Sequence, residues 1–153
     1  MAELDAGQPE RGRDQRGRDQ RGRDKKLRAL VVDDEPDIRL MLDLFLRNAG
    51  YEVRTAASAK AALAIVRRET VSFDIIISDI GLPGMDGYQL AKRLRRLQAY
   101  ARVPLIAVTG FVEYSDRPRA LEAGFDERLT KPINLDLLIK VIKRFNSPAH
   151  EAR

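Results

Sequence analysis

Acidic, hydroxyl and basic residues stand at the ends of short apolar runs along this sequence. The first run ends in Asp33 and Asp34, the third in Asp79, the fourth in Thr109, and Lys131 follows the fifth. If these runs form parallel strands, their carboxyl ends lie at one edge of a sheet, where the five side chains converge. Three carboxylates held that close repel one another, so such a cluster requires a cation.

This combination of groups suits phosphoryl transfer. A few carboxylates in a site open to water favour Mg²⁺ over a full Ca²⁺ cage. The metal ion and Lys131 can neutralise phosphoryl oxygens, while a hydroxyl such as that of Thr109 holds another. A carboxylate can itself be the nucleophile and form an aspartyl phosphate. Asp79 is the candidate because it ends the central strand, whereas the adjacent Asp33 and Asp34 are better placed to hold the ion.

The elements that must position these residues follow from the hydrophobic pattern. Apolar runs at 27–33, 51–55, 73–79, 103–109 and 125–129 alternate with amphipathic stretches. Residues 29–32 and 75–77 are continuously apolar, which is typical of central parallel strands covered on both faces. Strict alternation of strands and helices with short connections predicts an α/β fold, a five-stranded parallel sheet with right-handed crossovers.

Periodicity and capping residues support helices between the runs. Apolar residues fall on one stripe within residues 38–49 and again within 137–145, as an amphipathic helix requires. Suitable residues also stand where these helices would begin or end. They are Pro36, Ser58, Asp86 and Asn134 at the starts, and Gly50 and Gly124 at the ends.

Residues 1–26 differ in composition from the rest of the chain. A five-residue unit of the type Arg-Gly-Arg-Asp-Gln occurs three times between residues 11 and 25, and no apolar residue lies between Pro9 and Leu27. Such a segment cannot offset the entropy lost on ordering, so we expect a disordered, charged tail. Nucleic-acid binding through its arginines is the alternative, disfavoured because the repeat lacks aromatic residues and carries an Asp in each unit.

Composition excludes several classes of function. The 153-residue chain has no Cys and a single His, His150, so thiolate chemistry and clusters of His ligands are excluded. The formal net charge of +5 arises from interleaved charges of both signs, so nucleic acid is an unlikely partner. No apolar stretch is long enough for membrane insertion, and we expect a cytoplasmic protein.

Four motifs, in this order, resemble those of response-regulator receiver domains. They are Val-Val-Asp-Asp-Glu-Pro at 31–36, Asp-Ile-Ile-Ile-Ser-Asp-Ile-Gly-Leu-Pro-Gly-Met-Asp-Gly at 74–87, Ala-Val-Thr-Gly at 107–110 and Leu-Thr-Lys-Pro at 129–132. The resemblance divides the chain into a tail (1–26), a receiver domain (27–146) and a short polar end (147–153). It implies a flavodoxin-like, doubly wound sheet with strand order 2-1-3-4-5 and five helices.

The resemblance also implies a role for each matching residue. Asp79 corresponds to the phosphorylated aspartate, Asp33 and Asp34 to the acidic pair at the metal, and the backbone carbonyl of Gly81 to a further metal ligand. Thr109 matches the hydroxyl residue that moves toward the phosphoryl group. In the same way Lys131 matches the lysine that binds a phosphoryl oxygen, and its bond to Pro132 is expected to be cis.

Each of these residues also has a simpler interpretation. Asp33 and Asp34 could be helix caps, Thr109 a strand-end hydroxyl, and Lys131 a solvated charge. For any single residue, the simpler role explains its presence about as well as a role in phosphoryl transfer. The simpler roles do not explain why such residues stand at all four strand ends together.

Two positions depart from the receiver pattern. Receivers commonly carry an aromatic residue three positions before the lysine, where this chain has Arg128. The aromatic part of their switch is therefore in doubt, and neither Phe111 nor Tyr114 can be assumed to replace it. Gly81, two positions beyond Asp79, has no side chain to shield an acyl phosphate, which predicts a short-lived phosphorylated state.

These features predict a single-domain response regulator of a two-component phosphorelay. Asp79 would accept a phosphoryl group, in a Mg²⁺-dependent reaction, from a sensor histidine kinase or a His-containing phosphotransfer protein. We expect no turnover beyond its own phosphorylation and dephosphorylation, and its role as effector or phosphoryl shuttle stays open. The alternative is a phosphorylation-independent docking module with the same fold, which Arg128 supports and the acidic cluster opposes.

The residues from 146 onward are polar, and we expect no output domain there. The signal would therefore leave through a protein surface of the receiver domain itself. Basic residues are expected on the face of the fourth helix, fifth strand and fifth helix. They are Arg117, Arg119, Arg128, Lys140, Lys143 and Arg144. An acidic protein target is one interpretation of this face, and an ordinary solvated rim is the other.

Overall fold

The computed structural model describes residues 25–110 and 116–146. Nearly all of the predicted tail (1–26), the polar end (147–153) and the residues Phe111 and Tyr114 lie outside this described part. Within it, five strands form one parallel sheet in the order β2-β1-β3-β4-β5. The predicted fold class and strand order are therefore confirmed.

The strands differ in burial according to their place in the sheet. They are β1 (Arg28–Val32), β2 (Glu52–Ala56), β3 (Ile75–Asp79), β4 (Leu105–Thr109) and β5 (Glu127–Thr130). Every residue of β1, β3 and β4 is buried, as expected for central strands covered on both faces. The two edge strands, β2 and β5, alternate or mix burial and exposure, which explains their weaker apolar pattern.

Five α-helices connect the strands in the described part of the chain. They are α2 (Pro36–Asn48), α3 (Ala59–Arg68), α4 (Gly87–Arg95), α5 (Asp116–Ala123) and α6 (Leu135–Phe145), with a short 3₁₀ helix at Gln98–Tyr100. The predicted caps are present, because the side chains of Ser58, Asp86 and Asn134 each accept a hydrogen bond from an N–H three residues on. Gly50 and Gly124 follow α2 and α5 with positive φ angles of 96° and 116°, a conformation that favours glycine.

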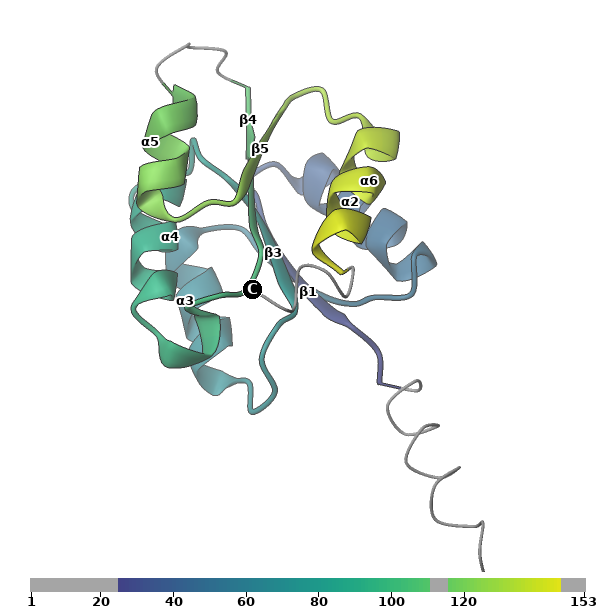
Figure 1. Ribbon diagram of the computed structural model, residues 1–153, viewed down its shortest axis with the longest axis horizontal. Coiled ribbons are helices and arrows are strands. Elements are labelled where there is room, and N and C mark those ends of the chain that lie inside the picture. The colour runs from purple at the N-terminus through teal and green to yellow at the C-terminus, as the bar shows by residue number, and fades with distance from the viewer. Residues whose placement is uncertain (1–24, 111–115, 147–153) are drawn as a thin grey trace, which may run out of the picture.

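The helices form two layers around the sheet. Figure 1 shows α2 and α6 on one face, and α3, α4 and α5 on the other. Each face has its own buried cluster, with Ile75 and Ile77 contributing to one and Ile76 to the other, because successive residues of a strand point to opposite faces. Among the described residues, no helix has the length and apolar composition that crossing a bilayer requires.

The strand register brings the candidate residues to one edge. Val32, which precedes Asp33, pairs with Ser78, which precedes Asp79. In turn Asp79 pairs with Val108, and Thr109 pairs with Thr130. The residues at the carboxyl ends of four strands therefore lie side by side.

Candidate functional site

The carboxyl edge of the sheet brings together three carboxylates. Asp33 and Asp79 are buried, with 2% and 7% of their surface exposed, and Asp34 is exposed. One carboxylate oxygen from each residue lies within 4.8 Å of the others. The sequence-based expectation that these three side chains converge is confirmed.

Lys131 reaches into this cluster from the end of β5. Its Nζ lies 3.0 Å from Asp33 Oδ2, 3.3 Å from Asp79 Oδ2 and 3.2 Å from Glu35 Oε1. Glu35 was not among the predicted site residues, because no sequence pattern links it to a lysine 96 positions away. Its place directly after Asp34, in the same loop, is the signal that could have indicated it.

The environment shifts the pKa of Asp79 and of Lys131. Burial, together with the charge of Asp33, raises the pKa of the Asp79 carboxyl, although Lys131 and the N–H of Gly81 oppose this shift. Burial works against the Lys131 ammonium, but hydrogen bonds to Asp33 and Glu35 hold its pKa above the ordinary lysine value. The lysine therefore stays charged. Its single positive charge lies among the carboxylates of Asp33, Glu35 and Asp79 and cannot neutralise all of them.

Thr109 and Gly81 complete the predicted set. Thr109 is buried at the end of β4, and its carbonyl accepts a hydrogen bond of 2.8 Å from the N–H of Lys131. Gly81 lies in the loop after β3, where its N–H donates to Asp79 Oδ1 at 3.2 Å. The bond between Lys131 and Pro132 is cis, as the resemblance implied.

Gly87 supports the site in a way that the motif alone did not reveal. It begins α4, and its N–H donates to the carbonyl oxygen of Ile80 at 2.9 Å. A Cβ at this position would lie 2.7 Å from the Cα of Ile80 and would also collide with the carbonyl oxygen of Asp79. A glycine here lets α4 begin directly against the backbone of the candidate nucleophile. The pair of Asp86, an N-cap, and Gly87 after the strand was the available signal.

Arg128 lies on the edge strand β5, as expected. Figure 1 shows β5 with α5 on one side and α6 on the other. The other residues of the predicted basic face are all exposed. They are Arg117, Arg119, Lys140, Lys143 and Arg144. Two of them have intramolecular contacts, since Arg119 stacks 4.3 Å from the ring centre of Tyr88, and Arg144 pairs with Glu127 at 2.6 Å.

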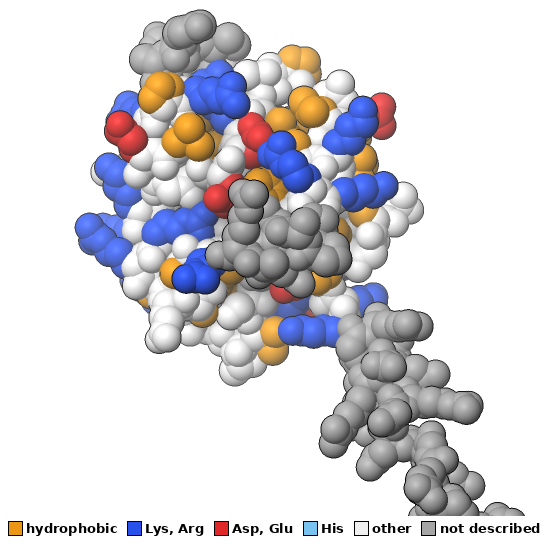
Figure 2. Space-filling model, viewed as in Figure 1, with side chains coloured by type: hydrophobic (Ala, Val, Ile, Leu, Met, Phe, Trp, Pro, Cys, Tyr) orange, Lys and Arg blue, Asp and Glu red, His pale blue; other side chains and the backbone are white. Residues whose placement is uncertain are grey.

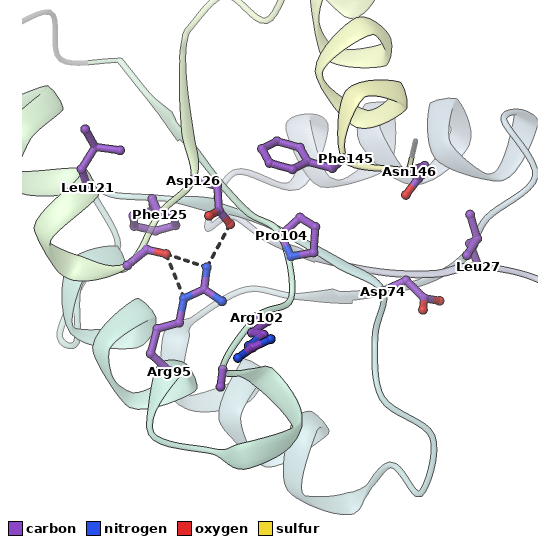
Figure 3. Close-up of a pocket in the computed structure, with 12 residues that line it drawn as sticks. Leu27, Asp74, Arg95, Arg102, Pro104, Leu121, Phe125, Asp126, Phe145 and Asn146 are labelled. Atoms are coloured by element: carbon purple, nitrogen blue, oxygen red, sulfur yellow. Dashed lines mark hydrogen bonds and ion pairs between the residues drawn. The ribbon is translucent and has the colours of Figure 1, made fainter. Parts of the chain in front are cut away.

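A separate hollow of about 750 Å³ lies at the amino-terminal ends of the strands, away from the acidic cluster (Figure 3). Residues that precede four of the strands line it, namely Leu27, Asp74, Pro104 and Asp126. Its carboxylates have partners within the fold, because Asp126 accepts from Arg95 at 2.9 Å and Asp74 accepts from the N–H of Arg28 at 2.7 Å. These two carboxylates therefore hold neighbouring segments of the chain together.

Comparison with known proteins identifies the family. The chain matches the response regulator receiver domain over residues 29–143. It is 39% identical over 116 residues to an uncharacterized 14.6 kDa protein from the sodA1 3′ region of Leptolyngbya boryana, covering 76% of this chain and 87% of that protein. It is also 35% identical over 124 residues to the sensor histidine kinase RcsC of Escherichia coli strain K12, covering 81% of this chain but 13% of the kinase. The chain belongs to the response regulator receiver domain family.

Solved structures agree with this assignment. The chemotaxis response regulator CheY4 of Vibrio cholerae is 34% identical, with a TM-score of 0.73 over 78% of this chain and 98% of that chain. The receiver domain of the sensor histidine kinase PA1611 of Pseudomonas aeruginosa PAO1 is 31% identical, with a TM-score of 0.70 over 78% and 97% of the two chains. That domain was solved with a magnesium ion coordinated in its active site cleft. The present chain is thus a CheY-like receiver domain of two-component response regulators, a class of signalling modules.

Proposed function

We propose that Asp79 accepts a phosphoryl group from a sensor histidine kinase or a His-containing phosphotransfer protein. The observation that carries this proposal is the position of the Asp79 carboxylate. It is buried at the end of the central strand β3, within 4.8 Å of carboxylate oxygens of Asp33 and Asp34 and 3.3 Å from the ammonium of Lys131. One nucleophile, a group of potential metal ligands and a cation therefore share one edge.

Asp79 is the nucleophile in the proposed reaction. A carboxylate oxygen of Asp79 attacks the phosphorus of a phosphohistidine, the phosphorus–nitrogen bond breaks, and an acyl phosphate forms while the imidazole leaves. Lys131 binds one phosphoryl oxygen, and the hydroxyl of Thr109 donates a hydrogen bond to another. Turnover is limited to the phosphorylation and dephosphorylation of the chain itself.

The donor set at this edge fits Mg²⁺. Asp33, Asp34 and Asp79 offer hard carboxylate oxygens, and we assign the backbone carbonyl of Gly81 as a further ligand. The cluster carries more negative charge than Lys131 neutralises, which favours an additional cation. When bound, the ion would neutralise charge on the transferred phosphoryl group. The magnesium ion in the PA1611 receiver domain supports this assignment.

The proposal is tested by intact mass spectrometry after incubation with acetyl phosphate. We expect a single phosphoryl adduct that requires Mg²⁺ and is absent in Asp79→Asn. Asp126→Asn is the matched control, because it removes a carboxylate from the opposite edge of the sheet, and it should still form the adduct. Failure of the wild type to gain an adduct, even with a phosphohistidine donor, would contradict the proposal.

A phosphorylation-independent docking module is the second candidate function. Arg128 favours it, because this residue stands where receivers commonly carry an aromatic switch residue. In such a module, Asp79→Asn would leave partner binding unchanged, whereas substitutions on the β5 edge would weaken it. The expected single-domain organisation, the cytoplasmic location and the choice between effector and shuttle stay predictions.

A further inference from the structure

Helices α3 and α4 carry only positive charge on their exposed sides. The stretches 57–68 and 87–104, which contain these helices, have no Asp or Glu. Spacings of three and four residues place Lys92, Arg93 and Arg96 on one stripe along α4 and its C-cap. Figure 2 shows blue side chains along the left side of the molecule, where Figure 1 places α4. The exposed cations of the two helices are Lys60, Arg67, Arg68, Lys92, Arg93 and Arg96.

The two helices are neighbours in one layer. They pack against each other on the same face of the sheet (Figure 1). Each of them connects two parallel strands, α3 from β2 to β3 and α4 from β3 to β4, so the two helices run in the same direction. Their exposed cations therefore form one broad positive surface, here called the α3–α4 surface.

These cations have no acidic partner in the part of the chain that the structure describes. None of the six side chains forms an ion pair with another described residue. Exposed arginines of other elements do form such pairs, since Arg47 pairs with Asp43 and Arg54 pairs with Glu69. The charge of the α3–α4 surface is therefore available to a ligand outside the domain.

The stability of the fold does not account for this charge. Cations in the last turn of a helix interact favourably with its dipole, which explains Arg67 and Arg68. Lys60, however, is the second residue of α3, where a cation opposes the dipole. Arg96 lies four residues after Lys92, and like charges at that spacing destabilise a helix. These charges therefore weaken the isolated helices while they strengthen attraction to an anion.

We propose that the α3–α4 surface adsorbs to the anionic headgroups of a lipid membrane. Clusters of four to eight basic residues bind such headgroups through charge alone, and each contributes roughly fivefold to binding. The uncharged residues exposed between the cations are short or polar, such as Ala64 and Gln89. Apolar side chains that could enter the hydrocarbon are not part of this surface, so the domain adsorbs at the headgroups without insertion.

The shape and composition of this surface favour a membrane over a nucleic acid. The cations are spread over two neighbouring helices, so a planar layer of anions can meet all of them at once. Single-stranded nucleic acid is bound largely by stacking on aromatic side chains. The aromatic residues of these stretches, Tyr88 and Tyr100, are both buried, so the α3–α4 surface offers no stacking platform.

Adsorption through this layer is compatible with phosphoryl transfer at Asp79. The acidic cluster lies at the carboxyl edge of the sheet, and the α3–α4 surface is the outer side of one helix layer (Figure 1). The opposite layer, α2 and α6, also stays free. The inference therefore does not depend on the proposed phosphorylation, and it can be tested with the unphosphorylated chain.

Cosedimentation of the full chain with lipid vesicles tests the proposal. One set of vesicles mixes phosphatidylglycerol with phosphatidylcholine, and the other contains phosphatidylcholine alone. The test variant is Arg93→Gln/Arg96→Gln. The matched control is Lys140→Gln/Lys143→Gln, which removes the same charge at the same spacing from exposed residues of α6, on the other face of the sheet.

We expect the wild type to bind the anionic vesicles at low salt and to be released at high salt, because salt screens exposed charges. Arg93→Gln/Arg96→Gln should bind at least roughly tenfold more weakly, whereas the α6 control should bind like the wild type. Equal losses in the two double variants would overturn the proposal. Equal binding to both kinds of vesicle, or a preference for a DNA duplex in competition with the anionic vesicles, would do the same.

A second measurement uses the wild type alone and so does not depend on how the variants fold. Vesicles that carry a small amount of a lipid with a gadolinium chelate on its headgroup broaden the NMR signals of nearby nuclei. The backbone amide resonances of α3 and α4 should broaden more than those of α2 and α6. Equal broadening of the two layers, or stronger broadening of α2 and α6, would overturn the proposed orientation and the proposal with it.

Discussion

The two edges of the sheet use charged residues in opposite ways. At the amino-terminal edge, the guanidinium of Arg95 donates to the carbonyl of Gly124 and to the carboxylate of Asp126 (Figure 3). It also donates to the carbonyls of Tyr100 and Val103. At the carboxyl edge, the single ammonium of Lys131 lies among Asp33, Glu35 and Asp79. Charges at the first edge are matched within the fold, whereas negative charge at the second is left in excess.

This difference separates residues that stabilise the fold from residues that are placed to bind a cation or a phosphoryl group. A balanced group such as that of Arg95 lowers the free energy of the folded state, because each buried polar atom has its partner. An unbalanced group such as that of Asp79 raises the energy of the unliganded fold, since like charges lie close together. Substitutions at the two edges should therefore affect stability and phosphorylation in different proportions.

Loss of Arg95 should have the largest effect on stability. In Arg95→Met the free energy of unfolding should fall by about 2–4 kcal/mol, because several oxygen atoms lose their donor at once. Arg96→Met removes the same charge from an exposed neighbour and should change stability by no more than about 0.5 kcal/mol. Urea unfolding measures both values. Equal losses in the two variants would remove the distinction between the edges.

Magnesium should stabilise the protein through the carboxyl edge. At a concentration of Mg²⁺ tenfold above its dissociation constant, the folded state should gain about 1.4 kcal/mol, seen as a higher melting temperature. Asp34→Asn should abolish this gain, whereas Asp37→Asn, an exposed acidic residue of the first turn of α2, should keep it. A full response in Asp34→Asn would place the ion elsewhere.

The side chain at position 81 should control the lifetime of the phosphorylated state. Gly81 is exposed beside Asp79, so water reaches the acyl phosphate without a side chain in the way. Gly81→Met should lengthen the half-life roughly fivefold, which corresponds to about 1 kcal/mol in the hydrolysis barrier, and Gly81→Ala should have a smaller effect. The decay of the adduct, followed by mass spectrometry, gives both half-lives. An unchanged half-life in Gly81→Met would refute this explanation.

The ion pair between Glu127 and Arg144 should have the smallest effect, and it depends on pH. Burial alone raises the pKa of Glu127, but hydrogen bonds from Arg144 and the N–H of Arg128 hold it below its ordinary value. The ionised form therefore stabilises the fold at neutral pH, and this contribution disappears as pH falls through the lowered pKa.

Thermal unfolding between neutral and acidic pH measures this contribution. Glu127→Gln should remove roughly 0.5 kcal/mol of stability at neutral pH and nothing at acidic pH. Glu122→Gln, an exposed residue of α5, is the matched control and should behave like the wild type. A larger loss of stability in Glu127→Gln at acidic pH than at neutral pH would contradict the lowered pKa of Glu127.

Much of the fold and of the candidate site could be predicted from the sequence. Continuous apolar runs identified the central strands because both faces of those strands are buried, as at Ile75 to Ile77. The site followed from the ends of these runs, since parallel strands bring their carboxyl ends together. The bounds of β2 and β5 were less clear, because edge strands expose part of each face.

The remaining features depend on contacts between residues far apart in the chain. Lys131 meets Glu35 across 96 positions, and Arg95 meets Asp126 across 31. Neither pair shares a motif, so no local pattern could have joined them. Among the described residues, the Nη1 of Arg128 has no hydrogen-bond partner, and this depends in the same way on how α5 packs over β5. The unusual residue at this position was nevertheless visible in the sequence.

The most direct test of the central claim is to locate the phosphoryl group. The chain is incubated with acetyl phosphate and Mg²⁺ and then treated with borohydride, which reduces an aspartyl phosphate to homoserine. Peptide sequencing by mass spectrometry should find homoserine at position 79 and nowhere else. Homoserine at position 33 or 34, or a phosphoryl group that resists reduction, would contradict the assignment of Asp79 as the acceptor.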